Sequence, residues 1–121
     1  MEAKDLMIGD YVYNHRNWEC PIVEIHKDSA VVIARHYGEE EFRVEDLSPI
    51  PLTPEILEKN GWEKTPTGYV FYTDGKRYDN SLWYIFGSNT FVVNTAEFQI
   101  KFVHQLQHAL RLCGIDKEIV L

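Results

Sequence analysis

The stretch "SPIPLTPEILEKNGW", residues 48–62, predicts a short helix with well-defined ends. Thr53 is a good N-cap, because its hydroxyl can accept a hydrogen bond from a backbone N–H of the first turn. Pro54 suits the first helical position. At the other end, Asn60-Gly61 can supply the left-handed backbone that stops a helix, and Trp62 is placed to fold back on it.

This helix divides the chain into two parts. Pro49 and Pro51 end the strands that precede it, because proline lacks a backbone N–H and holds the residue before it extended. We expect residues 1–52 to form one subdomain and residues 53–121 another. Because the linker is so short, the two are expected to share an interface and to form one compact unit.

Residues 1–52 are expected to form a small antiparallel β-barrel of the Src homology type. Runs rich in β-branched and aromatic residues alternate there with turn-forming pieces such as Gly9-Asp10. The runs are "DYVYN" (10–14), "PIVEIH" (21–26), "AVVIAR" (30–35) and "EEFRVEDL" (40–47). Four or five short strands at this spacing favour such a barrel.

Residues 53–121 predict an aromatic-rich antiparallel meander after the linking helix. Eleven of the sixteen aromatic residues lie between Trp62 and Phe102, and Asp74-Gly75 separates two extended runs, which is a strong hairpin signal. "AEFQIK" (96–101) fits a strand or a helix. We favour a strand to about Lys101.

A C-terminal helix is then expected to run to Cys113 and to pack on the meander. Val103, Leu106, Leu110 and Cys113 recur at helical spacing and give one apolar stripe, and Gly114 can end the helix. The whole chain is therefore predicted to be α+β: a small N-terminal barrel, a linking helix, and a meander with its helix.

The charge of the chain argues against several classes of partner. The 121 residues carry a net charge of −7, and residues 1–48 hold eleven acidic and five basic side chains, or −6. A protein that binds nucleic acid nonspecifically, or an anionic membrane, needs a basic surface instead. Cys20 and Cys113 form no CxxC pair, and the sequence predicts neither a signal peptide nor a membrane span. We therefore expect a cytoplasmic protein with free thiols.

Two histidines, His104 and His108, stand four residues apart in the C-terminal helix, the spacing with which zinc proteases hold their metal. Those enzymes carry a glutamate after the first histidine as general base, whereas this chain has Gln105, an amide that cannot take a proton from water. The spacing selects no third ligand. We expect no cofactor and two half-exposed histidines beside the apolar stripe, with a metal site as the alternative.

Three aromatic residues, Trp18, Trp83 and Tyr84, are candidates for binding. Trp18 lies in a predicted turn, and Trp83 and Tyr84 are neighbours in a predicted strand, so only one of that pair can face a one-sided core. Either a second layer covers the other residue, or an aromatic patch is exposed and marks a partner or dimer surface. No residue is predicted to be catalytic, since there is no phosphate-binding glycine loop and no nucleophile elbow.

The stretches "PIPLTPEILEKNGW" (49–62) and "HQLQHALRLCGIDKEIVL" (104–121) resemble those of a family of small uncharacterised proteins from Bacteroides-type gut anaerobes and their mobile elements. "MIGDYV" (7–12) extends the likeness loosely over the chain. The resemblance implies a bacterial cytosolic setting. It implies no activity, cofactor or site residue.

For the function, we expect a non-enzymatic interaction module that binds a protein partner or itself through the barrel or the aromatic sheet. One alternative is a metal-dependent enzyme that uses His104 and His108. Another is an acidic protein that occupies a nucleic-acid-binding partner by imitating phosphate charge, for which the net charge of −6 in residues 1–48 is the motive.

Overall fold

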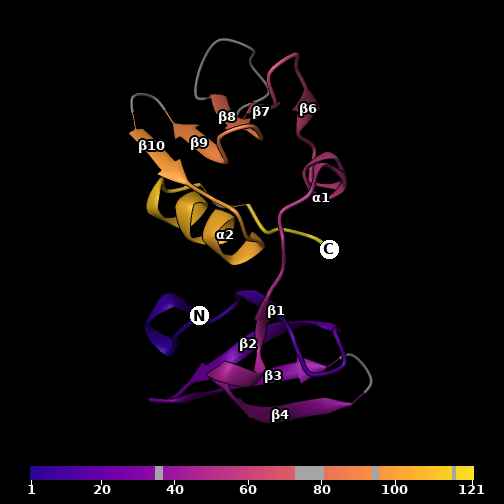
Figure 1. Ribbon diagram of the computed structural model, residues 1–121, viewed down its shortest axis with the longest axis vertical. Helices are drawn as coiled ribbons and strands as arrows, with labels where there is room; N and C mark the ends of the chain where they lie inside the picture. Colours follow the sequence, from indigo (N-terminus) through magenta and orange to yellow (C-terminus); the bar gives the residue numbers. More distant parts are fainter. Residues whose placement is uncertain (35–36, 73–80, 94–95, 116) are drawn as a thin grey trace. The chain divides into compact units, whose positions relative to one another are not determined.

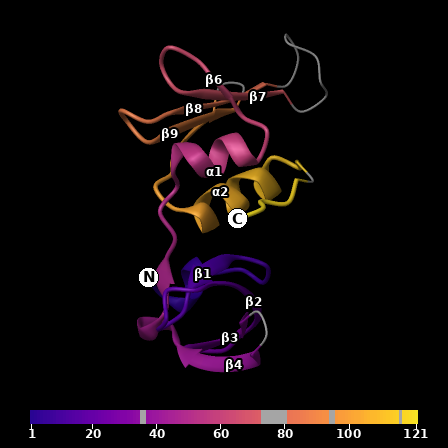
Figure 2. The same cartoon turned by 90° about the vertical axis from the view of Figure 1, so that its right-hand side faces the viewer.

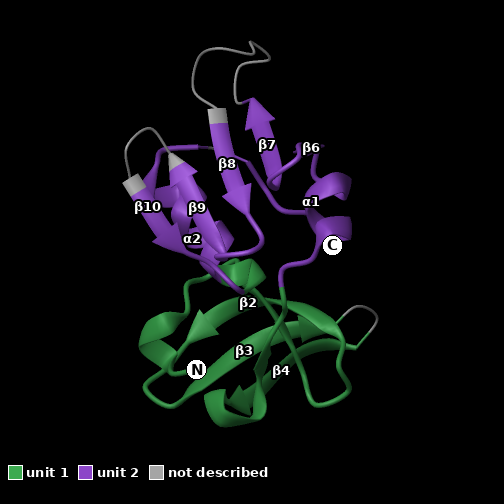
Figure 3. Cartoon of the chain, turned by 45° about the horizontal axis from the view of Figure 1, so that its top comes forward, with its two compact units in different colours: residues 1–51, 102–104 green, residues 52–101, 105–121 purple. Residues whose placement is uncertain are grey.

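The computed structural model, drawn in Figures 1 and 2, describes residues 1–34, 37–72, 81–93, 96–115 and 117–121. The chain divides into two compact units, which are coloured separately in Figure 3. Unit 1 comprises Met1–Pro51 and Phe102–His104, and unit 2 comprises Leu52–Lys101 and Gln105–Leu121. The described residues form two antiparallel sheets and two α-helices, so the predicted α+β class is confirmed.

Unit 1 is built on a five-stranded sheet with the strand order β4-β3-β2-β1-β5, in which all neighbours are antiparallel. Its elements are the 3₁₀-helix η1 (Ala3–Asp5), β1 (Tyr11–Tyr13), β2 (Glu19–Ile25), β3 (Ser29–Ala34), β4 (Gly38–Arg43), the 3₁₀-helix η2 (Val44–Asp46) and β5 (Ser48–Pro49). The pairing of β2 with β3 changes register between Ile22 and Glu24, a bulge that bends a strand. In the described residues β4 and β5 remain the two edges, so the sheet is not closed.

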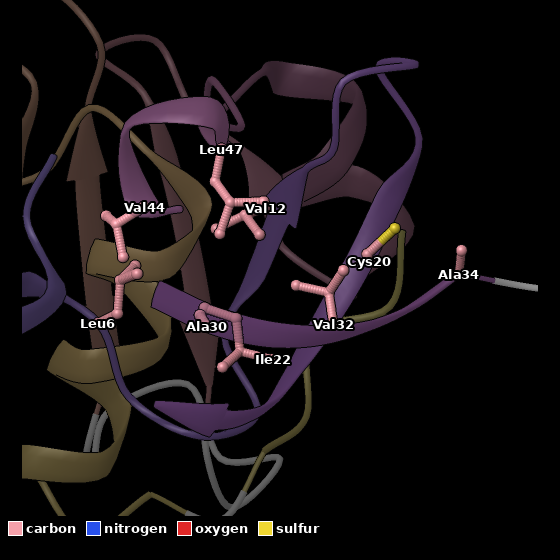
Figure 4. Packing of buried hydrophobic residues seen from close by; sticks show 9 residues of the cluster. All are labelled: Leu6, Val12, Cys20, Ile22, Ala30, Val32, Ala34, Val44 and Leu47. Atoms are coloured by element: carbon pink, nitrogen blue, oxygen red, sulfur yellow. The ribbon is translucent and has the colours of Figure 1, made fainter. Parts of the chain in front are cut away.

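The hydrophobic core of unit 1 comes from alternate positions of the central strands. On β3, Ala30, Val32 and Ala34 are buried while their neighbours are more exposed, as expected when side chains alternate between the faces of a strand. Figure 4 shows these three side chains with the others of the cluster: Leu6, Val12, Cys20, Ile22, Val44 and Leu47. Trp18 and Phe42 are partly buried against this cluster.

Unit 2 contains the second five-stranded antiparallel sheet, a meander with the order β10-β9-β8-β7-β6. Its elements are α1 (Pro54–Lys59), β6 (Glu63–Lys64), β7 (Tyr69–Tyr72), β8 (Ser81–Ile85), β9 (Thr90–Val93), β10 (Ala96–Gln99) and α2 (Val103–Leu112), whose first two residues are grouped with unit 1. The two helices lie on one side of this sheet (Figure 2). β7 pairs antiparallel with β8, as expected for a meander, whereas the predicted hairpin turn Asp74-Gly75 and the run that follows it lie outside the described residues.

The ends of α1 follow the predicted capping pattern. The Thr53 hydroxyl accepts a hydrogen bond from the Ile56 N–H, and Pro54 occupies the first turn. Gly61 has a φ of +87°, and the Trp62 N–H donates to the Leu57 carbonyl at 3.0 Å. This is the bonding of a glycine-terminated helix, which satisfies carbonyls that would otherwise lack donors.

Helix α2 begins and ends where the sequence places it to within about two residues. Gly114, with a φ of +72°, ends it, and the Ile115 N–H donates to the Leu110 carbonyl. The segment after Gly114 forms no strand in its described residues. Instead, the buried Asn60 side chain accepts a hydrogen bond from the Val120 N–H and donates one to the Val120 carbonyl, which fixes the segment beside α1.

Candidate functional site: an aromatic surface on unit 1

The loop between β1 and β2 is shaped by one side chain. Asn14 is 3% exposed, and its Oδ1 accepts hydrogen bonds from the N–H groups of Arg16 (2.9 Å) and Trp18 (3.0 Å). The Asn14 N–H in turn donates to the Trp18 carbonyl at 3.1 Å. Asn17 has a φ of +58°, a left-handed conformation that asparagine tolerates better than most residues. The loop therefore has a defined conformation, from which Arg16 and Trp18 project.

Two aromatic rings and a guanidinium group meet at this loop. The ring centroids of Trp18 and Tyr37 are 4.9 Å apart, with an interplanar angle of 38°. The guanidinium carbon of Arg16 lies 5.0 Å from the Trp18 ring and 5.3 Å from the Tyr37 ring, within cation–π range of both. Tyr37 directly precedes β4 and is 59% exposed. We call these three residues the Arg16–Trp18–Tyr37 cluster.

A second aromatic contact lies between the same loop and β4. The rings of His15 and Phe42 are 5.2 Å apart and tilted by 44°. Since Phe42 and Trp18 both pack on the unit 1 core, their positions depend on the fold of the sheet. We call the cluster together with His15 and Phe42 the aromatic surface of unit 1.

Acidic side chains accompany this part of unit 1. Burial raises the pKa of the Cys20 thiol, and the negative charges of Glu40 and Glu19 raise it further. These two carboxylates are therefore close to Cys20, which follows the Asn14–Trp18 loop and whose thiol contacts the Trp18 carbonyl at 3.4 Å. Cys20 itself is buried, so its thiol is a core group and not an exposed nucleophile.

The structure separates the three aromatic residues that the sequence proposed for binding. Trp18 belongs to the aromatic surface of unit 1. On β8, Trp83 is 40% exposed, whereas Tyr84 is only 1% exposed and its hydroxyl donates to the Ile100 carbonyl at 2.6 Å. Burial raises the pKa of this hydroxyl. Tyr84 is therefore a core residue, and the prediction that it is a candidate for binding is wrong.

Around Trp83, apolar side chains of β7, β8 and β9 share one face of the unit 2 sheet. The cross-strand neighbours of Trp83 are Val70, which is buried, and Val92, which is half-buried. Ile85, two residues along β8, is the other partly exposed apolar side chain of that strand. Trp83 is thus a partly exposed aromatic ring on the unit 2 sheet.

The two histidines of α2 differ in their surroundings. His104 is 4% exposed, and its ring stacks on Phe102 at 6.0 Å with an interplanar angle of 9°. The prediction of a half-exposed His104 is wrong, because α2 is buried over a wider arc than one stripe, including Gln107 and Ala109. His108 is half-buried, as expected.

Gln105 has a structural role at the position where a zinc protease would carry its glutamate. Its Oε1 accepts a hydrogen bond from the Lys101 N–H at 2.7 Å, just before the first turn of α2. Among the described residues, no group of three or more His, Cys, Asp or Glu side chains is placed to hold a metal ion. The metal alternative therefore gains no third ligand from the described part of the chain.

An open hollow elsewhere in unit 1 has no single chemical character. It lies between η1, the start of β3 and the end of β4, and opposite charges alternate along its lining. Lys4 pairs with Glu2 at 3.3 Å, and Arg43 pairs with Glu45 at 3.5 Å. Such exposed pairs neutralise one another and contribute little. This hollow therefore favours neither a cationic nor an anionic ligand.

Sequence reasoning missed five residues of the site, namely Asn14, His15, Arg16, Tyr37 and Phe42. An asparagine in a turn is the signal for the hydrogen bonds seen here, because its side chain can accept from backbone N–H groups that follow it. No local signal links Tyr37 to Trp18, since only the pairing of β2, β3 and β4 brings them together.

No helix in the described part of the chain has the length and hydropathy required to cross a membrane. The aromatic surface of unit 1 carries two pairs of contacting rings, Trp18 with Tyr37 and His15 with Phe42. In comparisons with known proteins, no family model, no curated protein and no solved structure matches the chain.

Proposed function

We propose that the protein is a non-enzymatic interaction module that binds a protein partner through the aromatic surface of unit 1. The observation that carries this proposal is the position of Arg16 over the rings of both Trp18 and Tyr37. Tryptophan, tyrosine and arginine are the residue types that dominate binding energy at protein interfaces. Here Arg16 and Trp18 lie on a loop whose conformation is already fixed, which lowers the entropic cost of binding, and Tyr37, just before β4, contacts both.

The sheet of unit 1 supports this proposal through its strand order. β5 returns to pair with β1, which is also the partner of β2, and η2 lies between β4 and β5. A meander whose last strand lies beside its first is one step from closure, so we propose that unit 1 is a small barrel of the Src homology type. That architecture recurs in binding modules, which supports the proposal only as an analogy.

We also propose that the protein works in the cytoplasm. Both cysteines are free, and free thiols are typical of a reducing compartment. A second copy of the chain is the other possible occupant of the aromatic surface. It is distinguished from a different protein by whether association occurs with the purified chain alone.

Replacing Tyr37 by alanine tests the proposal. Because its ring is exposed, the variant is expected to fold normally, yet binding of the partner should weaken by about tenfold, which corresponds to ~1.4 kcal/mol. The measurement is capture of partner proteins from the source cells by the tagged full chain, followed by titration of the purified partner. Equal affinity of Tyr37→Ala and the wild type would reject the aromatic surface as the binding site.

The matched control is a Trp83→Ala variant, which removes the exposed aromatic ring of unit 2. We expect it to fold, to lose about 1–2 kcal/mol of stability because Trp83 is partly buried, and to keep the affinity of the wild type. Thermal unfolding and the same titration provide both readouts. If Trp83→Ala loses the partner while Tyr37→Ala keeps it, the binding surface lies on the unit 2 sheet.

A further inference from the structure

We infer that the Trp18–Tyr37 ring pair is a platform for a cation, that Arg16 occupies it in the free chain, and that an arginine side chain of the partner protein takes its place on binding. This inference rests on the function proposed above and names the chemistry of the partner. It concerns a single occupant, a guanidinium group carried by a protein.

The geometry shows that the ring pair already accepts a guanidinium group. The Arg16 carbon lies within about 6 Å of both ring centroids, the range in which a cation is attracted to an aromatic face. Among the described residues, Arg16 makes no ion pair. Its side chain is therefore held by the rings and not by a carboxylate.

Displacing Arg16 does not require the loop to rearrange. The hydrogen bond from Arg16 to Asn14 uses the backbone N–H, so it survives when the side chain moves into solvent. The left-handed Asn17 and the hydrogen bonds of Trp18 to Asn14 likewise do not involve the Arg16 side chain. An incoming guanidinium group therefore competes only with the cation–π contacts of Arg16.

The charges around the platform favour a cationic partner. Glu19 and Glu40 are close enough to Cys20 for their charges to raise its pKa. The Cys20 thiol donates a hydrogen bond to the Trp18 carbonyl, so these carboxylates are also near the platform. Residues 1–48 carry a net charge of −6. An anionic group would bind against this field, whereas a guanidinium group is attracted by it.

The test uses the full-length chain labelled with ¹⁵N and the probe acetyl-Gly-Arg-Gly-amide, followed through the indole N–H signal of Trp18. Removing the competitor in Arg16→Ala is expected to tighten probe binding by about two- to fivefold, the strength of an exposed cation–π contact. Arg43→Ala is the matched control, because it makes the same change of charge in unit 1 at an exposed arginine away from the rings. It is expected to give a clearly smaller gain.

A second pair of variants separates the rings from the general charge of the protein. Tyr37→Leu leaves the net charge unchanged and removes an exposed ring, so the fold is not at risk. It is expected to weaken probe binding, and the double variant Arg16→Ala/Tyr37→Leu should lose the gain of Arg16→Ala. Acetyl-Gly-Glu-Gly-amide is expected not to shift the Trp18 signal.

Three results would overturn the inference. The first is an equal gain in Arg16→Ala and Arg43→Ala, which would mean that charge alone attracts the probe. The second is no binding of the arginine probe to Arg16→Ala. The third is binding of the glutamate probe that disappears in Arg16→Ala, which would make Arg16 the ligand of an anionic partner. If the partner capture still depends on Tyr37 in any of these cases, the proposed function stands and only the cationic partner is rejected.

Discussion

Replacing Gly68 by alanine is expected to lower the free energy of unfolding by about 3 kcal/mol. A Cβ atom at this position would clash with the carbonyl oxygen of Tyr84 and would lie 3.1 Å from the Cα of Ile85. Both contacts are with backbone atoms, so no side-chain rotation can relieve them. The start of β7 would have to move away from β8.

The cost of that movement comes from the contacts beside Gly68. Tyr69, the next residue, pairs with Tyr84 across the two strands. The Tyr84 hydroxyl in turn donates a hydrogen bond to the Ile100 carbonyl in the core. The Thr65 N–H donates to the Gly68 carbonyl, and the Gly68 N–H donates to the Thr65 hydroxyl, which closes the turn before β7. A shift at Gly68 therefore strains the turn and the strand pairing together.

Urea denaturation followed by circular dichroism measures the effect, and Gly87→Ala is the control. A Cβ atom at Gly87 meets nothing within 4 Å, and its backbone is not left-handed, so this variant should stay within about 0.5 kcal/mol of the wild type. An unchanged unfolding midpoint in Gly68→Ala would show that β7 and β8 do not approach as closely as the structure places them.

The parts of the fold that depend on near neighbours in sequence were predictable. The helix α1 needs only Thr53, Pro54 and Gly61, each of which acts within one turn of the chain. The antiparallel strands of both sheets likewise follow from the composition of short runs. In each case the physical cause is local, so a short stretch of sequence contains it.

The parts that depend on distant residues were not predictable in the same way. His104 was expected to be half-exposed because a helical stripe is narrow, yet burial of α2 depends on what surrounds it. The meeting of Trp18 with Tyr37 requires the register of three strands. Register depends on pairing across the whole sheet, and a single sequence specifies it only weakly.

The candidate site depends on both local and distant residues. Trp18 was found from the sequence as an aromatic residue in a turn, because both features are local. Its contact with Arg16 follows from the turn, whereas its contact with Tyr37 follows from the sheet. A binding surface built by two strand connections is therefore visible from sequence only in part.

Replacing Asn14 by alanine is expected to lower the free energy of unfolding by about 2 kcal/mol and to weaken partner binding as much as Tyr37→Ala does. The substitution removes the acceptor of two hydrogen bonds, from the Arg16 and Trp18 N–H groups, each of which contributes about 1 kcal/mol. The loop would then lose the bonds that hold Arg16 and Trp18 on the same side as Tyr37. Denaturation and partner titration measure the two effects separately.

Asn14→Asp is the informative control, because its carboxylate keeps an acceptor where Asn14 has Oδ1. Both hydrogen bonds can form again, so this variant should retain the loop and the affinity for the partner. Burying the carboxylate charge is expected to lower its free energy of unfolding below that of the wild type. The order wild type, Asn14→Asp, Asn14→Ala is thus expected for binding. If Asn14→Ala binds the partner as tightly as the wild type, the fixed conformation of the loop is not what prepares Trp18 for binding, and preorganisation of the loop is rejected.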